Sequence, residues 1–309
     1  MDHNVLLKYK GLNNSFNKTL VYGVGLEAGF YSELNNMILA ILYCLNNNIR
    51  FVLHSETANF KIKNGWSDYF EPFCDEKNNW YTNRFDHRFP SDIVFYKRTI
   101  LQLTNQLYRI DYFTYELFNE IHSRENESLS YLIPELKIDG GIQQACKKII
   151  SMIYHFNETT RHDIDIKKQN VSFQGKYIGF HIRGGDKIIE HDLITVDKYI
   201  KKAESLSCIR QGFIYTDDYN IFKLVCGKYS EWNFQTLTEK NENGYFHSDF
   251  QNLSNEIKKY QLIKMFTSME ILCKAEYTIC TYSSNIGMFL GMMMGERAVG
   301  VDFDAWRIW

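Results

Sequence analysis

The feature that most constrains the fold is an alternation of short apolar, β-branched runs with longer stretches of helical periodicity. The runs that predict strands are residues 18–24, 49–55, 92–97, 176–182, 212–216, 276–280 and 298–303. The stretches that predict helices are residues 32–45 (with Ser32 as N-cap), 101–123, 140–158, 196–206, 255–274 and 284–294. Strands that alternate with helices form largely parallel sheets covered by helices. The sequence therefore predicts an α/β protein, in which ligands bind beyond the carboxyl ends of the strands.

One polar stretch interrupts the alternation. Residues 157–170, NETTRHDIDIKKQN, show no apolar periodicity, and strand-like and helix-like runs restart after them. A polar segment without periodicity is typical of a linker. We therefore expect two domains of ordinary size, residues 1–165 and 166–309.

Composition excludes several classes of function. The net charge of −2 over 309 residues argues against a general binder of nucleic acid or membrane surfaces, which would carry a basic excess. The first residues show no apolar core long enough for a signal peptide, and the longest apolar run near them, residues 37–45, is too short to cross a bilayer. Seven cysteines without a C-x-x-C pair disfavour a zinc site or a disulfide framework. We expect a cytoplasmic protein, bacterial or, if viral, in the host cytoplasm.

The stretch GFHIRGGDKIIEH, residues 179–191, contains the first candidate site. A buried-looking strand leads into Arg183, then Gly184 and Gly185, which let the backbone turn tightly, and then Asp186 and Lys187. An arginine fork can grip a diphosphate bidentately. No Walker A loop and no G-x-G-x-x-G after a strand occurs in the chain. Either a charged turn or an anion site fits these residues alone.

Two further polar clusters follow predicted strands. Asp217 and Asp218 come after the strand at 212–216, where they could bind a metal, a ribose or a base, or cap the next helix. Ser283, Ser284 and Asn285 stand between a strand and a helix, where hydroxyls and helix N–H groups bind phosphate, or where a serine simply caps the helix. Together with Arg183, these strand ends indicate a pocket for a nucleotide diphosphate.

Several segments resemble the α1,6-fucosyltransferase group, which includes the core N-glycan enzymes and the rhizobial Nod-factor enzymes. In the second half they are HIRGGDK, YTDDYNIFK, ENGYFHSDF and AEYTICTYSSNIGMFLGMMMG, and in the first half GFYSELNNMILAILYCL and NGWSDYFEPFCD. The resemblance extends from about residue 20 to 290. It implies two Rossmann-like domains facing a cleft, the GT-B arrangement, with the acceptor on the first domain and GDP-fucose mainly on the second.

The resemblance also implies roles for individual residues. Those that it and the strand-end pattern assign to the donor are Gly29, His181, Arg183, Asp186, Asp217, Asp218, Ser283, Ser284 and Asn285. Arg183 would carry the β-phosphate, and Asp217 and Asp218 would lie near guanine or the acceptor. The implied reaction moves L-fucose from GDP-fucose to a sugar hydroxyl of a glycan, inverts the anomeric centre and needs no metal. Glu190 and His191 are the candidate bases, and Lys187 is a nearby orienting charge, with an exposed loop histidine as the alternative for His191.

The chain departs from the family pattern at three positions. Gly184 stands where a second arginine is usual, Ser268 where an aspartate is expected, and His191 where the family has a glutamate. These departures keep two alternatives open: a GT-B transferase for another nucleotide sugar, and a glycan- or nucleotide-binding relative without catalysis. The acceptor cannot be read from the sequence.

Overall fold

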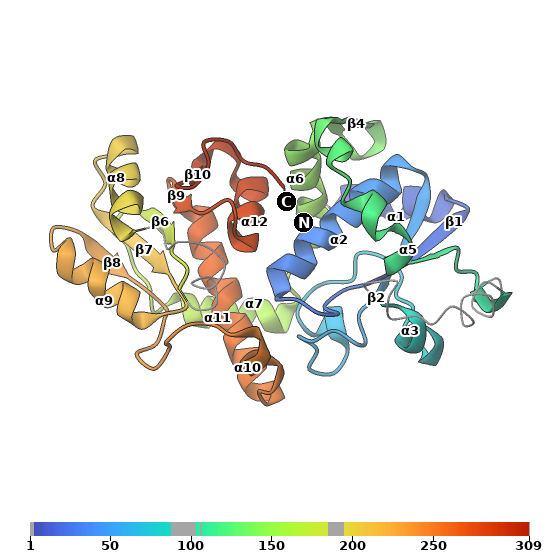
Figure 1. Ribbon diagram of the computed structural model, residues 1–309, viewed down its shortest axis with the longest axis horizontal. Coiled ribbons are helices and arrows are strands. Elements are labelled where there is room, and N and C mark those ends of the chain that lie inside the picture. Colours follow the sequence, from blue (N-terminus) through green and yellow to red (C-terminus); the bar gives the residue numbers. More distant parts are fainter. Residues whose placement is uncertain (1–2, 88–102, 106, 185–194, 309) are drawn as a thin grey trace. The chain divides into compact units, whose positions relative to one another are not determined.

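The computed structural model describes residues 3–87, 103–105, 107–184 and 195–308 (Figure 1). The chain divides into two compact units, Met1–Asn157 and Glu158–Trp309. Each has its own parallel sheet, and each is described separately below.

Within the described residues, unit 1 contains a parallel sheet of three strands in the order β2-β1-β3. Its strands are β1 (Lys18–Gly23), β2 (Ile49–His54) and β3 (Tyr112–Phe113), with a separate antiparallel hairpin of β4 (Ser130–Ile133) and β5 (Ile138–Gly141). Its helices are α1 (His3–Ser15), α2 (Phe30–Asn46), α3 (Trp80–Phe85), α5 (Thr114–Ile121) and α6 (Ile142–Ile153). The apolar helix α2 buries most of its residues and packs beside α6 (Figure 1).

Side-chain and loop-backbone groups cover the β2 edge of the unit 1 sheet. Asn13 of α1 pairs with both backbone groups of Phe51, donating to its carbonyl at 2.9 Å and accepting from its N–H at 2.8 Å. Leu53 exchanges backbone hydrogen bonds with Asp75 and Lys77. Because these bonds occupy edge groups of β2, they protect an edge that could otherwise pair with another chain.

Unit 2 is a five-stranded, wholly parallel sheet in the order β10-β9-β6-β7-β8. Its strands are β6 (Ile178–His181), β7 (Gln211–Tyr215), β8 (Asn233–Gln235), β9 (Thr278–Cys280) and β10 (Ala298–Gly300). Its helices are α7 (Glu158–Lys168), α8 (Val196–Leu206), α9 (Tyr219–Lys228), α10 (His247–Gln251), α11 (Asn255–Lys274) and α12 (Asn285–Met294). Figure 1 shows α8 on one side of this sheet and α11 and α12 on the other, so both faces of the central β6 are buried.

Most expected elements form, and the differences have physical causes. The run 92–97 lies outside the described residues. The expected helix 101–123 is wrong in extent, because the chain takes a left-handed turn at Arg109 (φ 54°) and then pairs with β1 as β3 before α5 begins. Helix α2 begins at Phe30 with Gly29 as its N-cap residue, so Ser32 lies inside the helix rather than at its cap.

The polar stretch expected to be a linker forms helix α7 instead. Thr160 and Ile164, one turn apart, are fully buried. Arg161 and Lys168 form ion pairs with Glu270 of α11, and Lys259 of α11 pairs with Asp163 at 2.9 Å. A helix that packs through a narrow apolar stripe and charged flanks shows little periodicity in its sequence.

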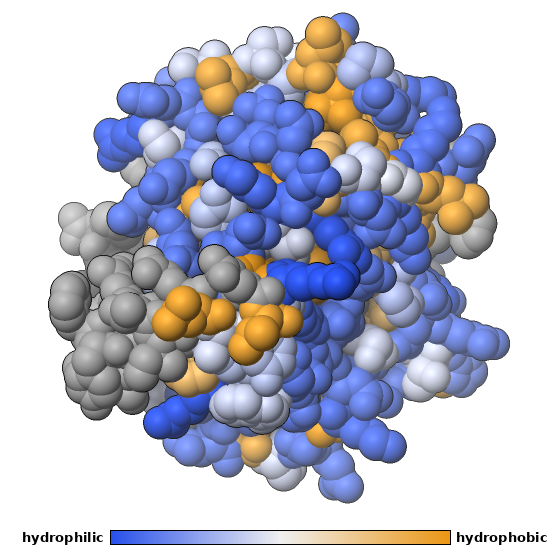
Figure 2. Space-filling model, turned by 90° about the vertical axis from the view of Figure 1, so that its right-hand side faces the viewer, coloured by the Kyte–Doolittle hydropathy of each residue, from blue (hydrophilic) through white to orange (hydrophobic). Residues whose placement is uncertain are grey.

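Exposed apolar residues do not form one continuous surface on the face shown in Figure 2, where separate orange groups stand among hydrophilic atoms. Trp80, Leu107 and Leu132 are among the large apolar side chains that are exposed. Scattered exposure of this kind is ordinary for a folded protein. Among the described residues, no helix combines the length and apolar character needed to cross a bilayer.

Candidate functional site

The order of strands in unit 2 determines where a ligand can bind. The chain runs from β6 to β7 and β8 on one side, then returns past β6 to β9 and β10 on the other. In parallel sheets the crevice for a ligand lies beyond the carboxyl ends of the strands at which this reversal occurs. Here those strands are β6 and β9, which lead into Arg183 and into the segment 281–285.

The strand end that carries Arg183 is fixed by the neighbouring strand. Ile182 donates its backbone N–H to Tyr215 at 3.0 Å, which continues the β6–β7 pairing by one residue. Gly184 donates its N–H to Asp217 Oδ1 at 2.7 Å, and Tyr245 donates to the other carboxylate oxygen at 3.2 Å. Asp217 therefore braces two loops through backbone groups. This carboxylate positions the Arg183 strand end.

Asp218 has a different task from its neighbour. Its carboxylate accepts the N–H of Asn220 at 2.8 Å and caps helix α9. The sequence left a metal ligand, a contact to ribose or base, and a helix cap open for the two aspartates. In the structure Asp218 is the helix cap.

His181, at the end of β6, is buried. Burial and the neighbouring Arg183 guanidinium lower the pKa of the imidazole to about 3. The ring is therefore neutral at physiological pH and stands 5.5 Å from the ring of Tyr215, centroid to centroid. Its Nδ1 has no hydrogen-bond partner within the described part of the chain. The neutral His181 ring fills the end of β6 and has one ring nitrogen, Nδ1, available for a hydrogen bond, while Arg183 carries the positive charge of this strand end.

The segment between β9 and α12 is tightly organised. Ser284 Oγ accepts the N–H of Gly287 at 3.0 Å and donates to Thr281 O at 2.8 Å, which caps α12. A Cβ at Gly287 would stand 1.9 Å from Thr281 O, so only glycine permits this turn. Ser284 is 2% exposed, whereas Ser283 is partly exposed and Asn285 follows it as the first residue of α12. Ser283 is thus the serine whose hydroxyl a ligand can reach.

Asp302 is a site residue that the sequence did not single out. Its two carboxylate oxygens accept the N–H groups of Tyr282 at 2.8 Å and Ser283 at 2.9 Å, and one of them also accepts Phe303 N–H at 3.0 Å. The only sequence signal was an acid within the last predicted strand, 298–303, which in the structure ends at Gly300. Asp302 does for the β9 loop what Asp217 does for the β6 loop.

In unit 1 the glycine loop after β1 is organised by Glu33. Its buried carboxylate accepts the N–H groups of Gly25 at 3.1 Å, Glu27 at 3.3 Å and Ala28 at 2.8 Å. Gly29 follows as the N-cap residue of α2. Because Glu33 is committed to the loop backbone, it is a poor candidate for a catalytic base.

A second buried polar group of unit 1 lies where β2 ends. His54 Nδ1 stands 3.2 Å from Asp86 Oδ2, and Asp86 Oδ1 accepts the N–H of Thr114 at 3.1 Å. His54 Nε2 stands 3.0 Å from Asn83 Oδ1. These bonds satisfy both ring nitrogens and tie β2, α3 and α5 together, which gives the group a structural explanation.

Asp186, Lys187, Glu190 and His191 lie outside the described residues, so their expected roles stay predictions. Ser268, at the position of the missing aspartate, is buried and donates to Lys264 O at 2.9 Å.

Glu270, the nearest acid to Ser268 along α11, is bound by Arg161 and Lys168. Burial raises the pKa of its carboxyl, but the hydrogen bonds from the two cations outweigh burial and lower it overall. Glu270 therefore serves the packing of α7 on α11.

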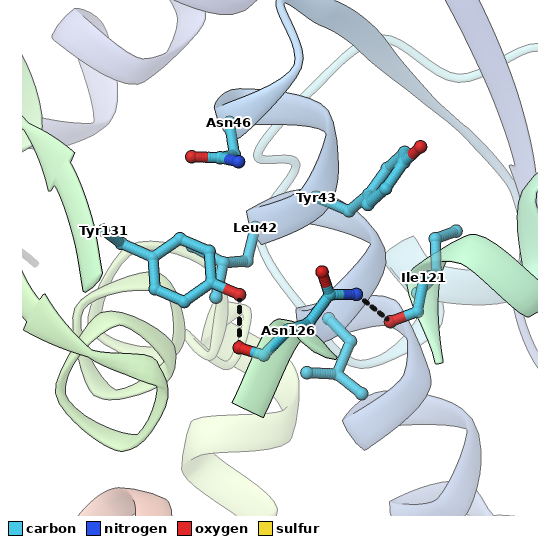
Figure 3. Close-up of a pocket in the computed structure, with 7 residues that line it drawn as sticks. Leu42, Tyr43, Asn46, Ile121, Asn126 and Tyr131 are labelled. Carbon is cyan, nitrogen blue, oxygen red and sulfur yellow. Dashed lines mark hydrogen bonds between the residues drawn. The ribbon is translucent and has the colours of Figure 1, made fainter. Parts of the chain in front are cut away.

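Unit 1 contains a small cavity of about 10 Å³, lined by residues of α2, α5 and β4 among others. Figure 3 shows residues that line the cavity of unit 1, where Tyr131 donates to Asn126 O at 3.0 Å and Asn126 Nδ2 donates to Ile121 O at 3.1 Å. Its size suits about one water molecule, so it is a packing feature. Within the described ranges, no three His, Cys, Asp or Glu side chains gather in a way that could hold a metal ion.

Comparison with known proteins identifies relatives over nearly the whole chain. The family described as alpha-(1,6)-fucosyltransferase N- and catalytic domains matches residues 13–293. An alpha-(1,6)-fucosyltransferase of Caenorhabditis elegans is 21% identical over 287 residues, which cover 87% of this chain and 48% of the relative. The chain thus spans about half the length of that curated relative.

Solved structures show a similar fold. NodZ alpha-1,6-fucosyltransferase soaked with GDP-fucose matches with a TM-score of 0.53 and 15% identity, over 90% of this chain and 92% of NodZ. POFUT1 in complex with GDP-fucose matches with a TM-score of 0.50 and 7% identity, over 94% of this chain and 98% of POFUT1. At these identities the likeness concerns the fold, and it confirms the predicted α/β architecture of the GT-B type with two Rossmann-like units.

Proposed function

This chain belongs to the alpha-(1,6)-fucosyltransferase family, and we propose that it transfers L-fucose from GDP-fucose to a sugar hydroxyl of a glycan or glycoconjugate. The observation that carries the proposal is the pairing, at the reversal point of the unit 2 sheet, of a strand end bearing Arg183 with the capped start of α12. Asp217 holds the strand end and Asp302 holds the segment before α12. In the described structure both carboxylates accept hydrogen bonds from backbone N–H groups.

The proposed reaction inverts the anomeric centre. The acceptor oxygen forms a bond to C1 of fucose while the bond from C1 to the β-phosphate oxygen breaks, and the acceptor proton passes to a base. Glu190 or His191 would take this proton, a role that contributes about 10²–10⁴-fold in rate. The negative charge that develops on the leaving diphosphate would be met by the Arg183 fork, the Ser283 hydroxyl and the N–H groups of the first residues of α12.

The proposal needs no metal ion, because Arg183 and the α12 start together neutralise the leaving group. EDTA should therefore leave turnover unchanged. Activity that disappears in EDTA and returns with Mn²⁺ would contradict this part of the proposal and would draw attention back to Asp217 and Asp218 as ligands.

The experiment that tests the whole proposal is a donor panel. Thermal shift with GDP, UDP and CMP should show stabilisation by GDP, since a ligand at 100 times its Kd adds about 2.7 kcal/mol. Release of GDP from GDP-fucose, without and with glycan acceptors, then measures turnover. Stabilisation by UDP alone would favour a different nucleotide sugar, and GDP binding without turnover on any acceptor would favour a non-catalytic relative.

A further inference from the structure

A hollow of about 400 Å³ lies in unit 2 between helix α8 and the segment after β10. One wall carries Lys198, Lys201, Lys202 and Ser205, and the other is formed by residues 300–304. Positions i, i+3, i+4 and i+7 share one face of a helix, so α8 presents its three lysines as a single stripe toward the hollow. The volume falls within the range of small-molecule sites, about 300–1,000 Å³.

The lining of the hollow carries more positive than negative charge, three lysines against Asp302 and Asp304. In the part of the chain that the structure describes, none of the three lysines forms an ion pair. The nearest acid on α8, Asp197, is instead paired with Lys228 at 2.7 Å. Three cations on one wall stand out in a chain whose net charge is −2. An arrangement of this kind attracts an anion.

The opposite wall offers a different chemistry. Asp302 and Asp304 line it, and Phe303 lies between them. The carboxylate of Asp302 is occupied by three backbone N–H groups, whereas Asp304 is exposed. An exposed carboxylate only accepts hydrogen bonds, and the hydroxyls of a sugar are donors that suit it.

We propose that this hollow binds an acidic monosaccharide unit, with its phosphate or carboxylate group on the α8 lysines and its hydroxyls toward Asp304. Arg183, Ser283 and Asn285 do not line the hollow, but Asp302 connects it to the nucleotide site proposed above, because Asp302 lines the hollow and holds the Ser283 backbone. The inference does not depend on which donor the chain uses.

The test compares binding of four probes to the full chain by ligand-observed NMR: glucose 6-phosphate, glucuronate, glucose and inorganic phosphate. The site variant is K198Q/K201Q/K202Q, which keeps good helix formers on α8. The control is K147Q/K148Q/K223Q, which removes the same charge from exposed lysines outside the hollow. Thermal unfolding of both variants shows that each is folded.

We expect glucose 6-phosphate or glucuronate to bind, glucose not to bind, and the site variant to weaken binding by roughly tenfold or more, as the loss of several exposed ion pairs implies. The control should bind as the unchanged chain does. Equal weakening in both variants, or no binding of either acidic sugar, would overturn the site. Inorganic phosphate that binds as well as glucose 6-phosphate, or an affinity for glucose 6-phosphate that is not weaker in Asp304→Ala, which removes the acceptor, would overturn the role of the sugar hydroxyls.

Discussion

Two adjacent aspartates should respond differently to the same substitution. Asp217 holds the N–H groups of Gly184 and Tyr245, whereas Asp218 caps α9. Asn is as good an N-cap as Asp, so Asp218→Asn should change stability by little. In Asp217→Asn one oxygen remains an acceptor, but the new NH₂ group faces a backbone N–H that also donates.

The size of the Asp217→Asn effect follows from the lost bond. A hydrogen bond to a charged group contributes about 1.5–3 kcal/mol, and partial exposure of the site places the loss near 2 kcal/mol. For a unit of this size the melting temperature should fall by about 4–8 °C. If GDP binds only the ordered loop, the same free energy weakens its Kd by up to about 30-fold, because the apparent Kd rises as the ordered fraction falls.

The assay is thermal unfolding together with calorimetric titration of GDP, for both variants and the unchanged chain. The reasoning is refuted if Asp217→Asn melts and binds GDP normally, or if Asp218→Asn loses as much of either. A loss of GDP affinity in Asp217→Asn without any loss of stability would instead indicate direct contact with the nucleotide.

Three further substitutions test the other parts of the site. Arg183→Lys keeps the charge but loses the fork, so GDP-fucose turnover should fall by about 10²–10³-fold while the melting temperature holds; near-normal turnover would remove the phosphate role. Because the pKa of His181 is about 3 in the folded chain and ordinary when unfolded, the unfolded state binds more protons as pH falls below about 6.5, and stability should drop by about 2 kcal/mol from pH 7.5 to 5. Denaturant titrations of the unchanged chain and of His181→Leu should show that this component is lost in the variant. Gly287→Ala, with its Cβ 1.9 Å from Thr281 O, should destabilise by more than about 3 kcal/mol, whereas Gly227→Ala on α9, where nothing lies within 4 Å, should be neutral or stabilising; similar unfolding curves would contradict the steric argument.

Strands and helices of unit 2 could be predicted because their signals are local. The apolar strand β9 ends at Cys280, four positions before Ser284, and a serine before an apolar helix marks an N-cap. Helix α7 was not predicted from the sequence because its stability depends on ion pairs with Glu270 of α11, about 100 residues later in the chain. The β4–β5 hairpin was not predicted either, because Pro134 and Lys137, which has a left-handed backbone conformation (φ 55°), interrupt the alternation of apolar and polar residues.

The sequence predicted where the residues of the candidate site lie along the chain, but not which hydrogen bonds each of them makes. Arg183, Asp217 and Ser284 fall where strand ends predicted polar residues. The sequence could not show that Asp217 binds the N–H of Gly184 in another loop whereas Asp218 caps α9. That difference depends on which backbone N–H group lies within hydrogen-bond distance of each carboxylate. It also gave no reason to connect Asp302 with Ser283, nineteen positions earlier in the chain.

The glycine at position 184 has a consequence for how this sequence could change over generations. A Cβ there would stand 3.0 Å from Ile221 Cδ1 and 3.3 Å from Asp218 Cβ, so any larger residue requires Ile221 to yield by a few tenths of an ångström. The arginine that the family pattern places at this point would therefore meet a neighbour already fitted to glycine. An arginine would be accepted at position 184 most easily if Ile221 had first become a smaller residue, so the effect of the substitution at 184 depends on the order of the two changes.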